Sequence, residues 1–200
     1  WAQLTGSSLK IAVNNGYCFA GNAALFGCSD FRIATKTSWI GMAGPAMIEG
    51  GGLGVFEPTD IGPVSVHEQN GVVDYIADNE EEATLIAKKL LSYFQGSVSE
   101  FSVCDQEILR NIMPEDRRYT YEVRDIINTI ADEGSFLELK KNYGQSIATG
   151  FIRIEGKPFA LLASDCQKLG GAIDSESAEK AAEFISVCND HGLSILVFAD

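Results

Sequence analysis

The segment GYCFAGNAA at residues 16–24 has the composition of a turn that presents main-chain amides to a ligand. It follows an apolar run at residues 9–13 and begins a stretch of small residues that predicts a helix. The first N–H groups of a helix have no partner within it, and the helix dipole adds positive charge there. We therefore expect Ala20, Gly21 and Asn22 to form an oxyanion hole, which stabilises a carbonyl oxygen as negative charge develops on it.

A second backbone-rich segment lies at residues 41–54, where six of the fourteen residues are glycine. Glycine at this density predicts a backbone pressed against a ligand or another chain, and a mobile loop is the alternative. His67, further along, either lines a pocket or serves as a hydrogen-bonded structural histidine. We expect the substrate to contact the following residues: Gly16, Cys18, Gly44, Pro45, Gly50, Gly51, Gly52 and His67.

The charge balance excludes one class of partner. A formal net charge of −13, with only 15 scattered Lys and Arg residues, argues against nucleic acid binding, which needs clustered cations. Lys10, Arg32 and Lys36 are the cations nearest the turn in sequence, and they are candidates to meet an anionic ligand. Ordinary solvated charge explains these three residues equally well.

Familiar catalytic and metal-binding motifs are missing from the sequence. It contains no Gly-x-Ser-x-Gly elbow, no Walker loop and no His-Glu-x-x-His. The five cysteines are widely spaced and include no Cys-x-x-Cys pair, and the two histidines lie far apart. We therefore expect no metal site and no disulfide framework, but buried free thiols in a reducing cytoplasm.

The bulk composition indicates a folded domain protein outside the membrane. Hydrophobic residues make up 46% of the chain, which is enough for a packed core. No apolar run approaches the roughly 20 residues that span a bilayer, so the sequence predicts no membrane association. The sequence begins Trp1-Ala2-Gln3 rather than with Met, and the expectation is a fragment of a longer protein.

The hydrophobic pattern predicts an α/β fold in both halves of the chain. Asp78 or Asn79 can cap the clearest helix, and the closing strand is apolar enough for burial on both faces, so the chain is expected to stop within its second domain. Ser175 can cap the last helix. Strands are expected at 9–13, 31–35, 38–42, 72–77, 135–139, 147–155, 158–164 and 193–199; helices at 19–27, 45–49, 80–91, 119–131 and from 175; and a linker at 96–118.

An ordered set of motifs along the whole chain resembles the carboxyltransferases of biotin-dependent acyl-CoA carboxylases, which belong to the crotonase-like superfamily. Each motif is common by itself, whereas their order is specific. The motifs are residues 16–31, IGMAGPAMIEGGGLG at 40–54, DIGP at 60–63, NGVVD at 70–74, LLSYF at 90–94, PEDRR at 114–118, YEVR at 121–124, GSFLEL at 134–139, RIEGKP at 153–158, LGGAID at 169–174 and KAA at 180–182.

The resemblance implies a fold and an activity. The fold is the crotonase-like (ClpP/crotonase) arrangement of ββα units, here as two incomplete halves: residues 1–104 as the later part of the CoA-binding domain, and 105–200 as a linker and the first part of the carboxybiotin-side domain. The activity is transfer of carboxylate from N1-carboxybiotin to the α-carbon of an acyl-CoA, with released biotin abstracting the α-proton, so that no metal and no side-chain base is needed. The family often has Gly or Ala at the position of Asn22, and its second oxyanion turn would lie beyond Asp200.

The resemblance also implies partners and leaves alternatives open. The partners are acyl-CoA, a biotin carboxyl carrier, a biotin carboxylase component and further copies of the same chain, whereas the fragment alone is expected to be inactive. A biotin-dependent acyl-CoA decarboxylase subunit is the nearest alternative. A crotonase-type hydratase or isomerase and a non-catalytic assembly subunit are two others.

Overall fold

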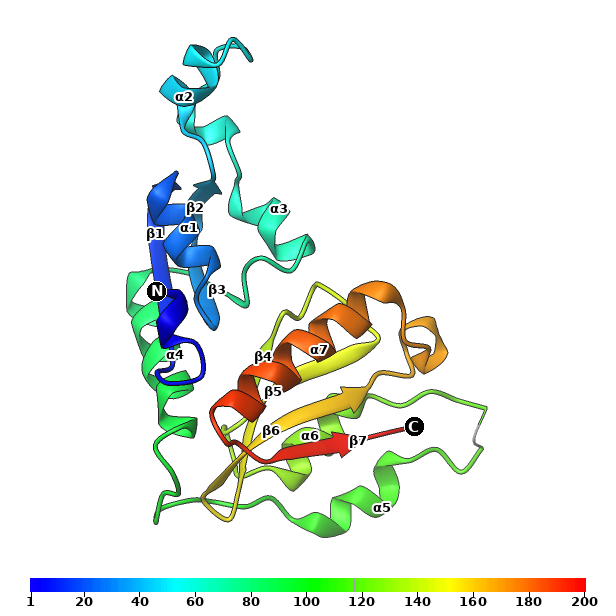
Figure 1. Cartoon of the computed structure of the whole chain (residues 1–200). Coiled ribbons are helices and arrows are strands. Elements are labelled where there is room, and N and C mark those ends of the chain that lie inside the picture. The colour runs from blue at the N-terminus through cyan, green and yellow to red at the C-terminus, as the bar shows by residue number, and fades with distance from the viewer. Residues whose placement is uncertain (117) are drawn as a thin grey trace. The chain divides into compact units, whose positions relative to one another are not determined.

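The computed structural model describes residues 1–116 and 118–200 (Figure 1). The chain divides into two compact units, Trp1–Lys89 and Leu90–Asp200. The sequence-based division at residue 104 concerns the domains of the family and stays a prediction. Arg117, within the PEDRR motif, lies outside the described residues.

The first unit is built on a three-stranded parallel sheet in the order β1-β2-β3. The strands are β1 (Ile11–Phe19), β2 (Phe31–Gly41) and β3 (Tyr75–Ala77). Two sequence-based boundaries were wrong: β1 continues past residue 13 through Asn14 and Asn15, and the two strands expected at 31–35 and 38–42 are one. The pairing of β1 with β2 instead shifts register between Asn14 and Gly16, which accommodates these residues without ending the strand.

Helices cover both faces of this sheet. On β2, Ala34 packs in a cluster with α1 (Gly21–Gly27) and α3 (Val64–Gln69), whereas the adjacent Ile33 packs against Ala83 of α4 (Glu80–Tyr93). Neighbouring residues of a strand point to opposite faces, so these are two separate layers of core. Asn79 caps α4 as expected, because its side-chain oxygen accepts a hydrogen bond from the Glu82 amide at 3.0 Å.

Between β2 and β3 the chain forms three short helical segments. They are α2 (Pro45–Gly50), the 3₁₀ turn η2 (Pro58–Asp60) and α3. The helix expected to begin with a proline is confirmed in α2, whereas α3 was not predicted from the sequence. A further 3₁₀ turn, η1 (Ala2–Leu4), precedes β1.

The second unit contains a mixed sheet in the order β4-β5-β6-β7. The strands expected at 147–155 and 158–164 form a hairpin: β5 and β6 pair antiparallel from Ile154 with Lys157 to Ile147 with Ser164, and β7 runs parallel to β6. The elements, in chain order, are η3 (Gln106–Ile108), α5 (Leu109–Ile112), α6 (Val123–Ile130), β4 (Leu137–Leu139), β5 (Ile147–Ile154), β6 (Lys157–Ser164), η4 (Leu169–Gly171), α7 (Ser175–Asp190) and β7 (Ile195–Phe198).

Helices α6 and α7 lie against opposite faces of this sheet, and in Figure 1 α7 lies in front of the sheet and runs roughly along its strands. Ile152 of β5 packs with Ile127 of α6, whereas the adjacent Phe151 packs against Phe184 of α7 with ring centroids 5.3 Å apart and the rings tilted by 50°. One expectation was wrong here: Asp174, rather than Ser175, caps α7. Val197 of β7 is 60% exposed, and the expectation that further chain covers this strand stays a prediction.

Candidate functional site

The turn between β1 and α1 has an unusual backbone at Ala20. Its φ of 55° and ψ of −123° lie in a region that residues with a side chain rarely adopt. Strained strand-to-helix turns of this kind present a nucleophile in hydrolases, with the following amide as an oxyanion donor. Ala20 carries only a methyl group, so this turn presents amides and no nucleophile.

The three amides predicted to form the oxyanion hole are not equivalent. The Ala20 N–H donates to the Gly41 carbonyl at 3.0 Å and is therefore already used in holding β1 against β2. Gly21 and Asn22 begin α1, and their N–H groups precede the first intrahelical bond, which Ala24 donates to the Ala20 carbonyl. These two amides remain the candidate donors, and Ala20 is the residue that aims them.

The space around the turn is open to a ligand. A Cβ atom built on Gly21 meets nothing within 4 Å, and both Gly21 and Asn22 are exposed. A shallow hollow of about 330 Å³ lies beside the turn, with Tyr17, Cys18 and Asn22 in its lining. Burial raises the pKa of the Cys18 thiol, which makes it a poor nucleophile and leaves the polar chemistry of this place to the amides.

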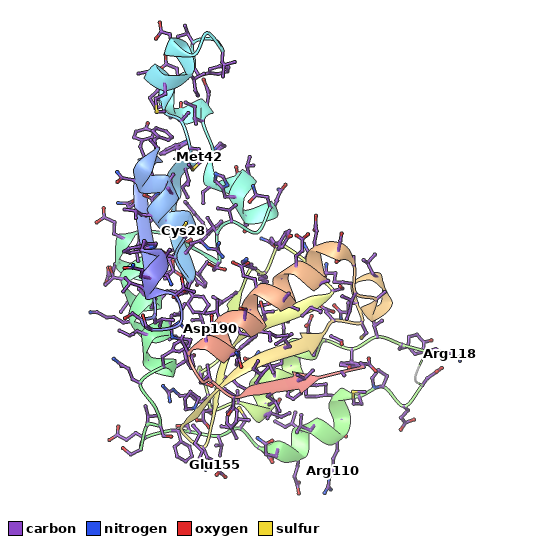
Figure 2. The ribbon with its side chains drawn as sticks, in the orientation of Figure 1. Cys28, Met42, Arg110, Arg118, Glu155 and Asp190 are labelled. Atoms are coloured by element: carbon purple, nitrogen blue, oxygen red, sulfur yellow. The ribbon has the colours of Figure 1, made fainter. Side chains whose placement is uncertain are left out.

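The glycines of the 41–54 segment have different surroundings. A Cβ on Gly44 would lie 3.3 Å from the Phe19 ring, so this glycine makes room for a side chain of the same unit. Gly50 has open space instead, as has Gly52, whose φ is 70°. The side chains here are also uncovered: Met42, labelled in Figure 2, is 67% exposed. Gly50 and Gly52 are therefore the members of this set that offer an open backbone.

His67 makes a structural hydrogen bond. Its Nε2 atom lies 2.7 Å from the carbonyl oxygen of Ile40, to which it must donate, and thereby ties α3 to the end of β2. Gly62 packs against the same carbonyl, because a Cβ atom built on Gly62 would lie 1.8 Å from the Ile40 oxygen. The bond supports the structural role that the sequence left open, and a contact of His67 with substrate stays a prediction.

The three cations considered for phosphate binding are paired with carboxylates. Lys10 lies 2.8 Å from Asp30, and Arg32 lies 2.9 Å from Asp74, with all four side chains largely buried. The Lys36 side chain is 65% exposed and forms a hydrogen bond with the side chain of Asp78, which raises the pKa of the lysine. The buried pairs hold the sheet to its loops, and only Lys36 is placed to meet a ligand in solvent.

The cysteines and acidic residues give no second site. All five cysteines are free; Cys18 and Cys188 are buried as expected, whereas Cys28 is exposed. Within residues 1–116 and 118–200, no three His, Cys, Asp or Glu side chains gather as metal ligands would. No described helix is both long and apolar enough to cross a membrane.

The fold defines a crotonase-like α/β protein, and the turn between β1 and α1 is its candidate site. Residues 2–200 match the family described as "Carboxyl transferase domain", and the chain belongs to this family. Its homologues are named as carboxyltransferase or carboxylase subunits, so the domain is a catalytic component of enzymes.

Two curated relatives match nearly the whole chain. The 12S subunit of methylmalonyl-CoA carboxyltransferase from Propionibacterium freudenreichii subsp. shermanii is 30% identical over 99% of this chain and 40% of its own length. The β6 subunit of a biotin-dependent acetyl-/propionyl-CoA carboxylase from Mycobacterium tuberculosis is 32% identical over 99% of this chain and 43% of its own. The chain thus spans about two fifths of these relatives.

Solved structures agree with this assignment. A single-chain, multi-domain long-chain acyl-CoA carboxylase superposes with a TM-score of 0.94 at 45% identity, covering 100% of this chain and 21% of that one. The transcarboxylase 12S hexamer, solved with hydrolysed methylmalonyl-CoA bound, superposes with a TM-score of 0.85 at 29% identity over 99% of this chain and 41% of that one.

The strain at Ala20 yields a stability prediction. Replacing Ala20 with glycine should raise the free energy of unfolding by about 1 kcal/mol, because glycine adopts a positive φ without strain and this outweighs its larger loss of entropy. Urea unfolding followed by circular dichroism measures the change. Ala24→Gly, four residues on in the same helix, should lower the stability by about 1 kcal/mol. A loss of stability in Ala20→Gly would contradict the strained conformation.

Proposed function

We propose that this chain is part of the carboxyltransferase component of a biotin-dependent acyl-CoA carboxylase. The full-length protein transfers carboxylate from N1-carboxybiotin to the α-carbon of acetyl-CoA, propionyl-CoA or a related thioester. The observation that carries the proposal is the open pair of amides at Gly21 and Asn22, at the end of a β-strand, in a chain that belongs to this family. Family membership alone would not say where in the chain the chemistry takes place.

In this mechanism the amides act on the thioester oxygen. Removing a proton from the α-carbon moves negative charge onto the thioester oxygen, and N–H groups fixed in advance stabilise that charge without reorganising. The carboxylated biotin supplies the carboxylate group. The turn fits this demand because Gly21 has no side chain and the space where its Cβ atom would lie is open.

No side-chain base is assigned in the first unit. The Nε2 atom of His67 is committed to the Ile40 carbonyl, and burial raises the pKa of the Cys18 thiol. The role of the protein at this turn is therefore to position the thioester and to stabilise the enolate that forms from it. Such a role suits an enzyme whose second substrate, carboxybiotin, releases a basic group that can accept the α-proton.

The remaining substrate contacts and partners are part of the same proposal. Gly16, Cys18, Gly50 and Gly52 line the approach to the thioester, together with the remaining residues predicted from the sequence: Gly44, Pro45, Gly51 and His67. The partners are a biotin carboxyl carrier, a biotin carboxylase component and further copies of the chain, as the names of biotin-dependent and hexameric relatives support. No metal takes part in this half-reaction, and the enzyme works in the cytoplasm.

A product analysis on the full-length protein tests the proposal. The enzyme is supplied with ATP, bicarbonate, its biotin components and either acetyl-CoA or propionyl-CoA, and the products are separated by mass spectrometry. Malonyl-CoA or methylmalonyl-CoA, formed only with biotin present, is the expected result. Net loss of carboxylate from an acyl-CoA would assign a decarboxylase, and biotin-independent hydration of an enoyl-CoA would assign a hydratase; either would overturn the proposal.

A further inference from the structure

Lys180 of α7 is a lysine whose ammonium group is buried inside the second unit. The residue is 2% exposed, and four main-chain carbonyl oxygens surround its Nζ atom. The oxygens are those of Ile147 at 2.7 Å, Lys140 and Tyr143 at 2.9 Å each, and Gly144 at 3.4 Å. We call these four groups the carbonyl cage.

Three carbonyls of the cage come from the segment that joins β4 to β5, and the fourth comes from Ile147, the first residue of β5. This segment lies close against the start of α7: a Cβ on Gly144 would come within 2.9 Å of the Ser177 amide, and the Ser146 and Ser177 hydroxyls lie 2.7 Å apart. Lys180 follows Ser177 by about one helical turn and therefore reaches the middle of the segment. The ammonium group thus donates to four carbonyls at once. Two of them also accept from the backbone: the Lys140 oxygen from the Tyr143 amide at 3.1 Å, and the Gly144 oxygen from the Ile147 amide at 3.3 Å.

The ligand atoms of the cage select a type of cation. Its four oxygens are neutral, and divalent cations in proteins prefer sites that include carboxylates. Rings of neutral carbonyl oxygens replace the hydration shell of K⁺ in selectivity filters. The charges further out are mixed: Glu138 and Asp165 favour the ammonium form of Lys180, whereas Arg124 and Lys140 oppose it. The cage is therefore suited to a single positive charge.

We propose that the carbonyl cage is a monovalent-cation site that the protein fills with its own side chain, and that it takes up free NH₄⁺ or K⁺ when Lys180 is shortened. The site is independent of the proposed oxyanion turn, which lies in the other unit. Burial lowers the pKa of Lys180 to about 8, so the side chain is mostly protonated at pH 7, where the cage is expected to hold a cation.

The test is cation-dependent stability of the Lys180→Ala variant of the whole chain. Urea unfolding is followed by circular dichroism at pH 7 in 0.2 M chloride salts of K⁺, NH₄⁺, Na⁺ and choline. We expect the midpoint in KCl or NH₄Cl to exceed that in choline chloride by about 0.5 M urea, with Na⁺ below K⁺. The unaltered protein should show no difference between K⁺ and choline, because its cage is already filled.

Lys180→Met is the matched control. Its unbranched apolar side chain leaves no space for an ion, so it should lose stability equally in all four salts. Equal midpoints for Lys180→Ala in KCl, NH₄Cl and choline chloride would overturn the proposal, as would a variant that stays unfolded in all salts. The unaltered protein gives a second test: a caged ammonium exchanges its protons slowly, and its Nζ signal should be visible by ¹⁵N NMR at pH 7. Absence of that signal also contradicts the proposal.

Discussion

Replacing the Gly21 N–H with an ester oxygen is expected to lower carboxyl transfer by the full-length enzyme about 10²- to 10³-fold. Incorporating glycolic acid at position 21 removes the donor and adds no side chain, so the space in front of the turn stays open. The lost amide stabilises charge that exists only in the transition state, and the loss should therefore appear in kcat, with KM for acyl-CoA changed much less.

Ala24 provides the matched control within the same helix. Its N–H donates to the Ala20 carbonyl at 3.0 Å, so an ester at position 24 removes a helix hydrogen bond but no candidate donor. This second ester should lower the free energy of unfolding by about 1 kcal/mol and leave kcat nearly unchanged. If the Gly21 ester kept full kcat, or if both esters reduced kcat equally, the oxyanion role of this turn would be wrong.

The turn itself could be predicted from the sequence, but which of its amides already donate a hydrogen bond within the protein could not. A strand, a run of small residues and a helix follow one another, and local patterns of this kind indicate a backbone that a ligand can approach. The Ala20 N–H donates a hydrogen bond to the carbonyl oxygen of Gly41, a residue far away in sequence. Such a pairing depends on the register of β1 and β2, and no local pattern encodes that register.

The glycine-rich segment illustrates the same limit. The sequence treats its glycines as one set, yet Gly44 gives room to Phe19 while Gly52 adopts a positive φ in open space. Only the positions of distant side chains separate the two roles. The role of His67 could likewise not be decided from the sequence, because its hydrogen-bond acceptor is the carbonyl of Ile40, which precedes it by 27 residues.

Most of the larger elements followed their hydrophobic periods, and the errors have physical causes. Asn14 and Asn15 favour turns, which predicts that the first strand ends at residue 13. The register shift with β2 instead lets β1 continue through both residues. Contacts with the neighbouring strand β2, rather than local composition, determined this result.

Buried charge in the second unit was not foreseen either, and it leads to the second large effect. Arg124 of α6 contacts three carboxylates: Glu138 at 2.6 Å, Asp165 at 2.7 Å and Glu122 at 3.2 Å. The Asp165 side chain is only 1% exposed. The hydrogen bond with Glu138, followed by that with Asp165, keeps the pKa of Arg124 above its usual value.

Arg124→Met is expected to lower the free energy of unfolding by about 3 kcal/mol at pH 7, because it leaves the Asp165 carboxylate buried without its cation. Urea unfolding of the whole chain measures the loss.

Arg118→Met is the control for Arg124→Met, because it removes an arginine whose ion pair is exposed rather than buried. Arg118, labelled in Figure 2, pairs with Asp116 at 2.6 Å, but its side chain is 86% exposed and water replaces the lost contact. An exposed pair of this kind contributes about 0–1 kcal/mol, so this variant should unfold near the unaltered midpoint. Equal losses in the two variants would mean that the burial of Asp165 is not what makes Arg124 necessary.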